Sequence, residues 1–235
     1  MLRAYLFLLF FIPWTFVCAF SALIFTLFDS SGTLYHAHAR LWSRLALLVA
    51  GVRVRVEGLE LIPRDQPVIF MGNHQGNFDT LALFKAIPCR FSWLAKEELF
   101  RIPVFGHSMQ RAGYIPLNRG DGREALRSLE TAAAKVRSGA SVLIFPEGTR
   151  NPDGNLLPFK KGGFILAVKA GVPVVPFTIN GSREINPRNR IELYPGTLSI
   201  RFGAPIAVDA KGNRQRDELM EQVRQAIAAN LEPCI

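Results

Sequence analysis

The sequence has few of the residues that bind metals or form disulfides. Its 235 residues include only 3 cysteines and 4 histidines. Cys18 lies in a long apolar run, Cys89 follows a proline and Cys234 is next to last, so no two cysteines have the spacing of a disulfide framework, a metal site or a redox motif. We therefore expect free cysteines in a reducing compartment and a chemistry that needs no metal.

The sequence also lacks the glycine-rich signatures of nucleotide binding, because it contains neither a P-loop nor a dinucleotide fingerprint. Acidic residues are in deficit, with 19 Asp and Glu against 28 Lys and Arg, which leaves a net charge of +9. Such a chain attracts anionic partners. The arginines are scattered and no aromatic–basic RNA motif occurs, so we expect the partner to be membrane phospholipid and not nucleic acid.

One long segment lacks charge altogether. Between Ala4 and Phe28 there is no charged residue, and a run of this length can enter or cross a bilayer. The run is longer than the apolar core of a typical cleaved signal peptide, so it predicts a membrane anchor. Pro13 leaves both a spanning helix and a re-entrant helix open. Because arginines follow from Arg40 onward, we expect the body of the chain on the cytoplasmic side of the membrane.

The segment after this run has the pattern of an amphipathic helix. Residues 33–51 place apolar side chains on one side and set His38, Arg40 and Arg44 apart from them. The pattern predicts either a helix at the membrane surface or an ordinary helix docked on the core. We assign residues 1–51 to a membrane anchor with an interfacial helix, and residues 52–235 to one α/β domain that is large enough to bury a core. The sequence does not indicate an oligomeric state.

From residue 52 onward, short apolar runs alternate with helical patterns. This alternation predicts an α/β fold with a mixed, mostly parallel central sheet flanked by helices. The expected strands are 52–56, 68–71, 91–94, 141–145, 172–179, 191–194 and 198–202. The expected helices are 79–86, 103–111, 123–138, 161–170 and 214–230. The turn Pro195-Gly196-Thr197 between the last two strands predicts that they pair antiparallel at an edge of the sheet.

A histidine and an aspartate separated by four residues follow the second expected strand. Residues five apart on a helix point in different directions, so His74 must precede the helix if it is to meet Asp79. Asn77 is a suitable N-cap, and Asp79 then falls in the first turn, where the helix dipole favours an ionised carboxylate. The pattern predicts a general base with its orienting acid. A turn in which these residues serve only as helix caps is the alternative.

Three other polar segments follow apolar runs. Phe145–Arg150 follows an expected strand, and the guanidinium of Arg150 suits phosphate oxygens while Glu147 can accept hydrogen bonds from a polyol. Trp93–Lys96 and Gly113–Arg119 each end in one cation. Each segment alone would be a solvated turn, but ligands bind where the strands of an open α/β sheet end. Together the segments predict one shared site.

In order and spacing, four segments resemble the four motifs of the glycerolipid acyltransferases, and more closely the bacterial 1-acylglycerol-3-phosphate acyltransferases. These segments are His74–Asp79, Gly113–Arg119, Phe145–Arg150 and Val172–Pro176, and the resemblance covers residues 52–202. It implies a membrane-bound enzyme of phospholipid biosynthesis that makes phosphatidic acid. The acyl group would pass from an acyl-CoA or acyl-acyl carrier protein thioester to the sn-2 hydroxyl of 1-acylglycerol-3-phosphate (lysophosphatidic acid). The resemblance implies no further cofactor.

The same resemblance assigns roles to individual residues. His74 is the general base and Asp79 its partner, while Arg150 and Lys96 bind the phosphate of the acceptor. Four other motif residues belong to the acceptor pocket, with Glu147 nearer the glycerol: Arg119, Glu147, Gly148 and Thr149. The acyl-chain region would be lined by Val172, Pro173 and Pro176. Asn118 departs from the family pattern, in which many members carry an acidic residue before the arginine, so the fine contacts to the acceptor stay open.

Two alternatives to this function remain. The chain could acylate another lysolipid, such as a lyso-ornithine lipid or lysophosphatidylglycerol. It could also be a non-catalytic lipid-binding protein whose histidine is structural. The sequence distinguishes neither the two acyl donors nor the length of the acyl chain, although a basic surface would suit an acidic carrier protein.

Overall fold

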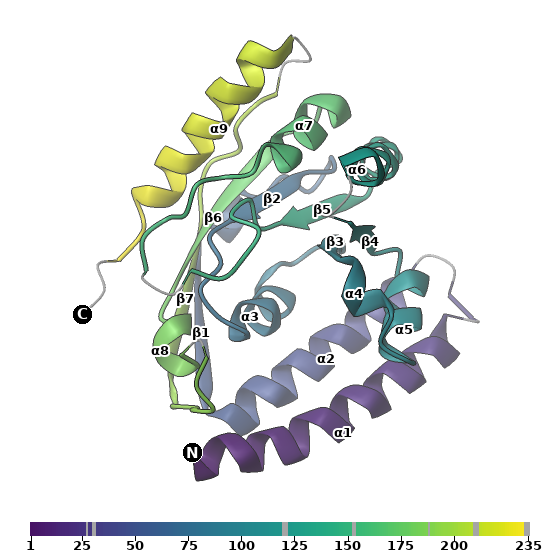
Figure 1. Cartoon of the computed structure of the whole chain (residues 1–235), viewed down its shortest axis with the longest axis vertical. Helices are drawn as coiled ribbons and strands as arrows, with labels where there is room; N and C mark the ends of the chain where they lie inside the picture. The colour runs from purple at the N-terminus through teal and green to yellow at the C-terminus, as the bar shows by residue number, and fades with distance from the viewer. Residues whose placement is uncertain are drawn as a thin grey trace.

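A mixed sheet covered by helices on both faces organises the chain (Figure 1). The computed structural model describes residues 1–26, 28–29, 32–118, 122–151, 154–187, 189–208 and 212–232. The strands are β1 Val52–Glu57, β2 Ile69–Gly72, β3 Phe91–Lys96, β4 Ile115–Leu117, β5 Ser141–Ile144, β6 Val174–Asn180 and β7 Gly196–Phe202. The helices are α1 Leu2–Phe25, α2 Thr33–Ala50, η1 Leu59–Leu61, α3 Phe78–Ala86, α4 Glu97–Phe100, α5 Phe105–Arg111, α6 Gly122–Arg137, α7 Lys161–Ala170, α8 Ser182–Ile185 and α9 Gly212–Ala228.

The strand order confirms a mixed, mostly parallel sheet but corrects the predicted pairing at its edge. The order is β1-β7-β6-β2-β5-β3-β4, and only β6 and β7 run antiparallel among the described strands. Residues 191–194 do not form the expected strand. The Tyr194 N–H donates to the Ile185 carbonyl of α8 at 2.9 Å, so this segment packs beside α8 and joins no ladder. The antiparallel partner of β7 is therefore β6, and β1 extends the sheet beyond β7.

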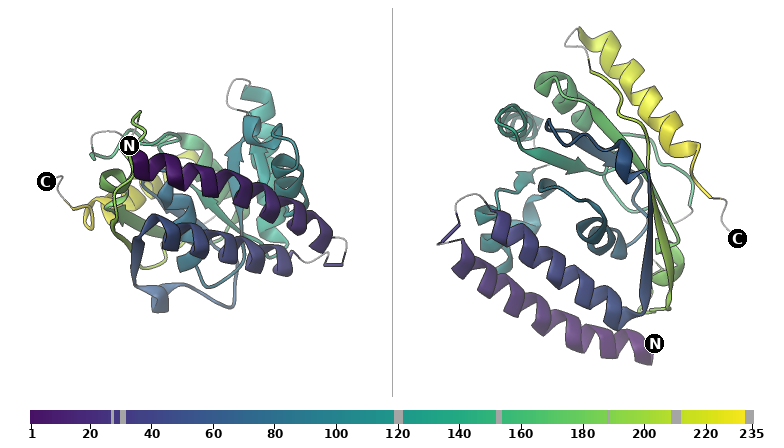
Figure 2. Two further views of the ribbon diagram at one scale, coloured as in Figure 1. Left: turned by 90° about the horizontal axis from the view of Figure 1, so that it is seen from below. Right: turned by 180° about the vertical axis from the view of Figure 1, so that it is seen from behind.

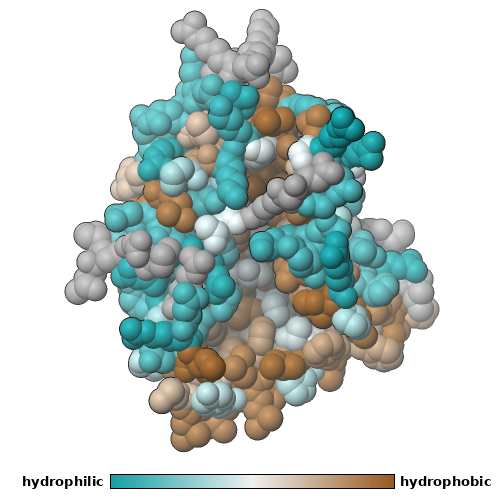
Figure 3. Space-filling model, in the orientation of Figure 1, coloured by the Kyte–Doolittle hydropathy of each residue, from teal (hydrophilic) through white to brown (hydrophobic). Residues whose placement is uncertain are grey.

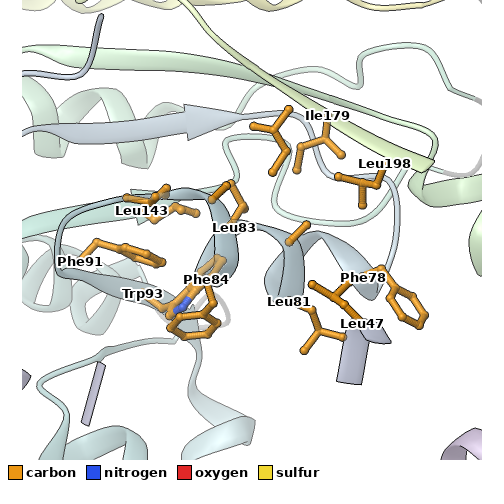
Figure 4. Close-up of a cluster of buried hydrophobic side chains, with 14 of the residues drawn as sticks. Leu47, Phe78, Leu81, Leu83, Phe84, Phe91, Trp93, Leu143, Ile179 and Leu198 are labelled. Carbon is orange, nitrogen blue, oxygen red and sulfur yellow. The ribbon is translucent and has the colours of Figure 1, made fainter. Parts of the chain in front are cut away.

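The central strands β2, β5 and β6 are buried at every position because helices cover both faces of the sheet. Phe70 of β2 and Leu143 of β5 belong to the cluster under α1, α2 and α3, part of which Figure 4 shows. Their neighbours on the same strands point to the other face, where they pack with α6, α7 and α9: these are Ile69, Met71, Val142 and Ile144. Burial of one such side chain stabilises the fold by about 1.5–3 kcal/mol. The continuous apolar runs that predicted strands are thus explained by two cores, one on each face.

The helices α1 and α2 form an antiparallel hairpin along the lower side of the domain (Figure 1 and Figure 2, right). The Arg3 guanidinium donates to the Ala50 carbonyl at 2.9 Å, and the Phe7 ring lies 5.6 Å from that of Phe78 in α3. Farther along, the Trp42 indole N–H donates to the Thr15 hydroxyl at 3.0 Å. Residues on both sides of the predicted boundary at position 52 share one hydrophobic cluster. The hairpin is thus built into the domain.

The opposite face of α1 is apolar and exposed. By length and composition α1 could cross a membrane, with 24 residues and a mean hydropathy of 2.3. Its buried residues are mainly small, namely Ala4, Phe7, Cys18, Ala19 and Ala22. Its large side chains are exposed instead, including Leu2, Tyr5, Leu6, Leu9, Ile12, Phe16, Val17 and Phe20. In Figure 3 the hydrophobic surface accordingly gathers over the lower part of the molecule, where this hairpin lies.

Candidate functional site

The chain leaves the sheet at the end of β2 through a fixed asparagine. The buried Asn73 side chain donates to the Ile179 carbonyl at 2.8 Å and accepts from the Ile179 N–H at 2.7 Å. This amide takes the place of a backbone partner and ties the end of β2 to β6. His74 therefore emerges from a rigid strand end. Sequence reasoning assigned no role to Asn73, because a buried asparagine cannot be told from a turn asparagine without its partners.

The structure confirms the predicted placement of His74 before α3 and of Asp79 in its first turn. His74 Nδ1 donates to Asp79 Oδ2 at 2.7 Å. The same oxygen accepts the N–H groups of Gln75 at 2.7 Å and Gly76 at 2.9 Å. Asp79 is fully buried, and these three donors compensate its charge. With Nδ1 bonded to a carboxylate, Nε2 of the imidazole is left to accept a proton.

Asn77 stands at the N-cap of α3, but its side chain caps nothing there. Asp79 instead reaches back to the loop before the helix, where it accepts the N–H groups of Gln75 and Gly76. Asn77 instead donates to Asn186 Oδ1 at 2.8 Å and accepts from Arg150 at 2.7 Å. The amide thus orients the guanidinium that was predicted to bind phosphate.

Glu147 holds the main chain and does not line the cavity that begins at His74. One carboxylate oxygen accepts the His74 N–H at 2.9 Å, and the other accepts the Leu157 N–H at 2.9 Å. The residue is only 2 % exposed. Burial raises the pKa of the Glu147 carboxyl, and the two N–H donors oppose that rise. Each of its oxygens already accepts a backbone N–H, and the expectation that Glu147 lies nearer the glycerol stays a prediction.

A cavity of about 540 Å³ begins at His74 and extends toward the hairpin. Ligand cavities in proteins have volumes of this order. Its lining includes His74 and Asn77 together with four residues predicted for the acceptor: Lys96, Gly148, Thr149 and Arg150. Among the described residues no Asp or Glu side chain lines it. Two cations and no carboxylate make this end of the cavity suited to an anion.

One face of the imidazole is covered by an aromatic ring. The rings of His74 and Phe145 lie 4.0 Å apart between centroids and 5° from parallel. Phe145 is the first residue after β5 and also lines the cavity. Its motif was predicted from the sequence, but the contact with His74 was not.

The comparisons with known proteins agree with this geometry. The acyltransferase family matches residues 53–180, which is more than half of the chain. The chain belongs to the acyltransferase family.

Individual relatives carry a more specific name. The 1-acyl-sn-glycerol-3-phosphate acyltransferase of Pseudomonas aeruginosa is 33% identical over 81% of this chain and 75% of that protein. The chloroplastic enzyme BAT2 of Brassica napus, of the same name, is 40% identical over 84% of this chain and 56% of that protein. The chain spans about half the length of the plant and algal relatives. The resemblance to glycerolipid acyltransferases predicted from four motifs is confirmed.

A solved structure covers nearly the whole chain. The crystal structure of the 1-acyl-sn-glycerophosphate (LPA) acyltransferase PlsC from Thermotoga maritima matches with a TM-score of 0.83 and 29% identity. The match covers 98% of this chain and 95% of that chain. The fold of this family member is therefore shared from the N-terminal hairpin to the last helix.

The residues predicted for the acyl-chain region do not line the cavity. The strands β2 and β6 pair in parallel, and their first residues lie side by side. Val172 and Pro173 come just before the start of β6, whereas His74 comes just after the end of β2. The two segments therefore lie at opposite ends of this strand pair. Pro176 lies beside Met71 inside the sheet. Val172, Pro173 and Pro176 do not line the cavity, so their assignment to the acyl-chain region stays a prediction. Arg119 lies outside the described residues.

Most of the remaining lining of the cavity comes from residues outside the four motifs, with Tyr114 as an exception. The hairpin supplies much of it, through Thr15, Cys18, Ala19, Ala22, Tyr35, His38, Ala39 and Trp42. The remainder comes from α3, β3, α5 and neighbouring residues, including Thr80, Phe84, Trp93, Leu94, Leu99, Phe105, Ser108, Met109 and Tyr114. The only sign of this wall in the sequence was the group of small residues Cys18, Ala19 and Ala22 on one face of α1. Small residues on a helix can pack closely against a neighbour or leave room for a cavity, and the sequence does not show which.

The structure adds nothing to the metal prediction. Within the part of the chain that is described, no group of three or more His, Cys, Asp or Glu side chains is arranged to hold a metal ion. The expectation of a metal-free reaction stays a prediction.

Proposed function

We propose that the chain is a membrane-associated 1-acylglycerol-3-phosphate O-acyltransferase that makes phosphatidic acid. The observation that carries the proposal is the His74–Asp79 pair at the polar end of a cavity that is lined by Lys96 and Arg150 and is otherwise largely apolar. A base, an anion site and space for a hydrocarbon chain are the parts that acylation of a lysophospholipid requires. The names of the relatives support the same substrate.

In the proposed reaction, the sn-2 hydroxyl attacks the thioester carbonyl while Nε2 of His74 removes its proton. The tetrahedral intermediate then collapses, the carbon–sulfur bond breaks, and the imidazolium returns the proton to the leaving thiolate. Asp79 stabilises the imidazolium through Nδ1. The acceptor itself is the nucleophile, so no acyl-enzyme is formed. The donor is acyl-CoA or an acyl-acyl carrier protein.

In this proposal Arg150 and Lys96 bind the phosphate of the acceptor. Gly148, Thr149 and Arg119 complete the acceptor pocket. The Asn77 side chain holds the guanidinium of Arg150 at 2.7 Å, which preorganises its planar fork for phosphate oxygens. Arg150→Ala should therefore raise KM for the lysolipid more than it lowers kcat.

We infer that the hairpin lies in one leaflet with the exposed apolar face of α1 among the lipid chains. The packing of α1 along α2, from Arg3 to Thr15, supports a helix that lies on the domain and does not cross away from it. The arginines that follow α1 favour the cytoplasmic side of the inner membrane. The lysolipid would then reach the cavity from the bilayer.

The test is acyl transfer by purified, detergent-solubilised protein, with lysophosphatidic acid as acceptor and labelled palmitoleoyl-CoA or palmitoleoyl-acyl carrier protein as donor. His74→Ala should lose about 10² to 10⁴ of the rate. His107→Ala, which changes an exposed histidine of α5 outside the cavity, is the matched control and should keep full activity.

A panel with lysophosphatidylglycerol and a lyso-ornithine lipid decides among acceptors. Faster acyl transfer to either of these lipids would show that it, and not lysophosphatidic acid, is the preferred acceptor. A folded wild type that binds lysolipid but transfers no acyl group to any acceptor would instead support the binding-protein alternative. Full activity in His74→Ala would refute the assignment of the base.

A further inference from the structure

We propose that Phe145 is a positioning residue for His74, and that its aromatic face both fixes the plane of the imidazole and stabilises the imidazolium formed during acyl transfer. This inference rests on the proposed function, because it assumes that His74 is the base. It concerns a residue of the Phe145–Arg150 motif to which the resemblance gave no role.

The contact between the two rings is unusually close and parallel for this protein. The centroids lie 4.0 Å apart and the planes differ by 5°. Aromatic pairs usually lie about 4.5–7 Å apart and prefer offset or edge-to-face arrangements. The other ring contacts of Phe145 are of that ordinary kind, at 5.8 Å to Trp93 and 6.2 Å to Phe177. These two rings fix Phe145, so that it presents its face to His74.

The stack supplies a restraint that the hydrogen bond to Asp79 cannot supply. The Nδ1–Oδ2 bond of 2.7 Å fixes one atom of the imidazole, about which the ring could still tilt. A flat ring against one face removes that tilt. With both contacts in place the lone pair of Nε2 has a single direction, which a general base needs at the moment of proton transfer.

The backbone of His74 is held by the same segment. Glu147, two residues after Phe145, accepts the His74 N–H at 2.9 Å, and the Asn151 N–H donates to the His74 carbonyl at 2.7 Å. The Gly148 N–H donates to the Phe145 carbonyl at 3.0 Å, which closes the turn. The Phe145–Arg150 segment therefore restrains both the main chain and the ring of His74.

The electrostatic part follows from the charge that the reaction creates. His74 is neutral before the hydroxyl is deprotonated and cationic afterwards. The face of a benzene ring is negative and attracts a cation, and this attraction is greatest where water is excluded. The His74 side chain is 19% exposed. The contact strengthens only when the proton has moved, so it favours the transition state over the ground state by roughly 5- to 30-fold.

A purely structural role for Phe145 gives different expectations. If the ring only filled space among Trp93 and Phe177, an aliphatic side chain of similar size would serve, and the electron density of the ring would not matter. The two roles are therefore separable by changing the face of the ring while keeping its shape.

The experiment measures kcat and KM for lysophosphatidic acid in full-length protein with phenylalanine, 4-fluoro-, 3,5-difluoro- and 3,4,5-trifluorophenylalanine at position 145. Successive fluorines weaken the negative face with little change of shape. We expect kcat to fall stepwise, by roughly 5- to 30-fold over the series, while KM stays constant. The acidic limb of the pH profile of kcat/KM should move toward lower pH as the imidazolium loses its support.

Conventional variants complete the test. Phe145→Tyr keeps an aromatic face and should retain most activity, whereas Phe145→Leu should lose at least as much as the trifluoro variant. Phe159→Leu is the matched control, because Phe159 is another partly buried phenylalanine that stacks on Phe164 and packs in the cluster on the other face of the sheet. Thermal unfolding of each variant shows whether it is folded.

The outcomes separate this inference from the function on which it rests. If the wild type transfers acyl groups and His74→Ala does not, but kcat and the pH profile are unchanged across the fluorinated series, Phe145 is only a packing residue and the inference is overturned. If His74→Ala keeps its activity, the assignment of the base fails first. A stepwise fall in kcat together with the pH shift supports the inference.

Discussion

Replacement of Glu147 by glutamine separates a structural role from a role in substrate binding. In the structure its two oxygens accept the N–H groups of His74 and Leu157, each at 2.9 Å. An amide offers only one acceptor oxygen, so at least one buried N–H loses its partner. The loss costs about 1–3 kcal/mol in free energy of unfolding. For a chain of this size it lowers Tm by roughly 2–10 °C.

The same substitution should act on catalysis through the backbone of His74. A displacement of a catalytic group by about 1 Å costs on the order of 10²-fold in rate. We therefore expect Glu147→Gln to lower kcat by about that factor and to leave KM for lysophosphatidic acid within about twofold of the wild type.

The assay combines thermal unfolding in detergent with initial rates over a range of lysophosphatidic acid concentrations. Glu60→Gln, at an exposed glutamate of η1, is the control and should change neither property. A different result would refute the reasoning: if Tm and kcat were unchanged and KM rose tenfold or more, Glu147 would contact the acceptor as the family resemblance implied.

Three other substitutions test the same structure. Asp79→Asn removes the charged acceptor of His74 Nδ1, so kcat measured at saturating substrate should fall by about 10² to 10⁴; a fall of less than tenfold would contradict the pairing. Burial, assisted by nearby arginines, lowers the pKa of His36 from 6.5 to about 4. The unfolded chain therefore binds a proton at a higher pH than the folded protein does, and the free energy of unfolding should fall by up to about 3 kcal/mol as the pH falls from 6.5 to 4. His36→Phe should flatten that slope in unfolding measured across this range, and an unchanged slope would place its origin elsewhere. Gly106→Ala would press a methyl group against the Phe100 carbonyl and should lower stability by about 1–3 kcal/mol, whereas Gly122→Ala, with open space around it, should not; equal Tm values would show that the backbone yields.

The parts of the fold that local sequence determines were predicted well. The helix 161–170 has the predicted bounds, and His74 and Asp79 lie where a strand, a turn and a helix start require. These features depend on neighbours in the sequence. The pairing of β7 with β6 was missed because a short turn beside two apolar runs cannot show that one run packs against α8 instead.

The lining of the cavity was the least predictable part. Glu147 was assigned to the acceptor because a carboxylate after a strand can face either a ligand or backbone N–H groups, and only the fold decides which. The apolar wall was assigned to Val172 and its neighbours because the resemblance supplied a motif there. In the structure much of the cavity wall comes from α1 and α2, whose small cavity-facing residues acquire a function only through contacts with distant segments.

One helix forms both the exposed apolar surface that we propose lies in the membrane and an inner wall of the cavity. The exposed side of α1 carries large apolar residues such as Leu9 and Phe16, while Cys18 and Ala22 on its other side line the cavity. Cutting the chain at Val52 to obtain a water-soluble domain would therefore open the chamber along its length and expose the core beneath α2. Under the proposed function, the anchor cannot be removed and the chemistry kept, because the helix that would hold the membrane is also the helix that would enclose the substrate.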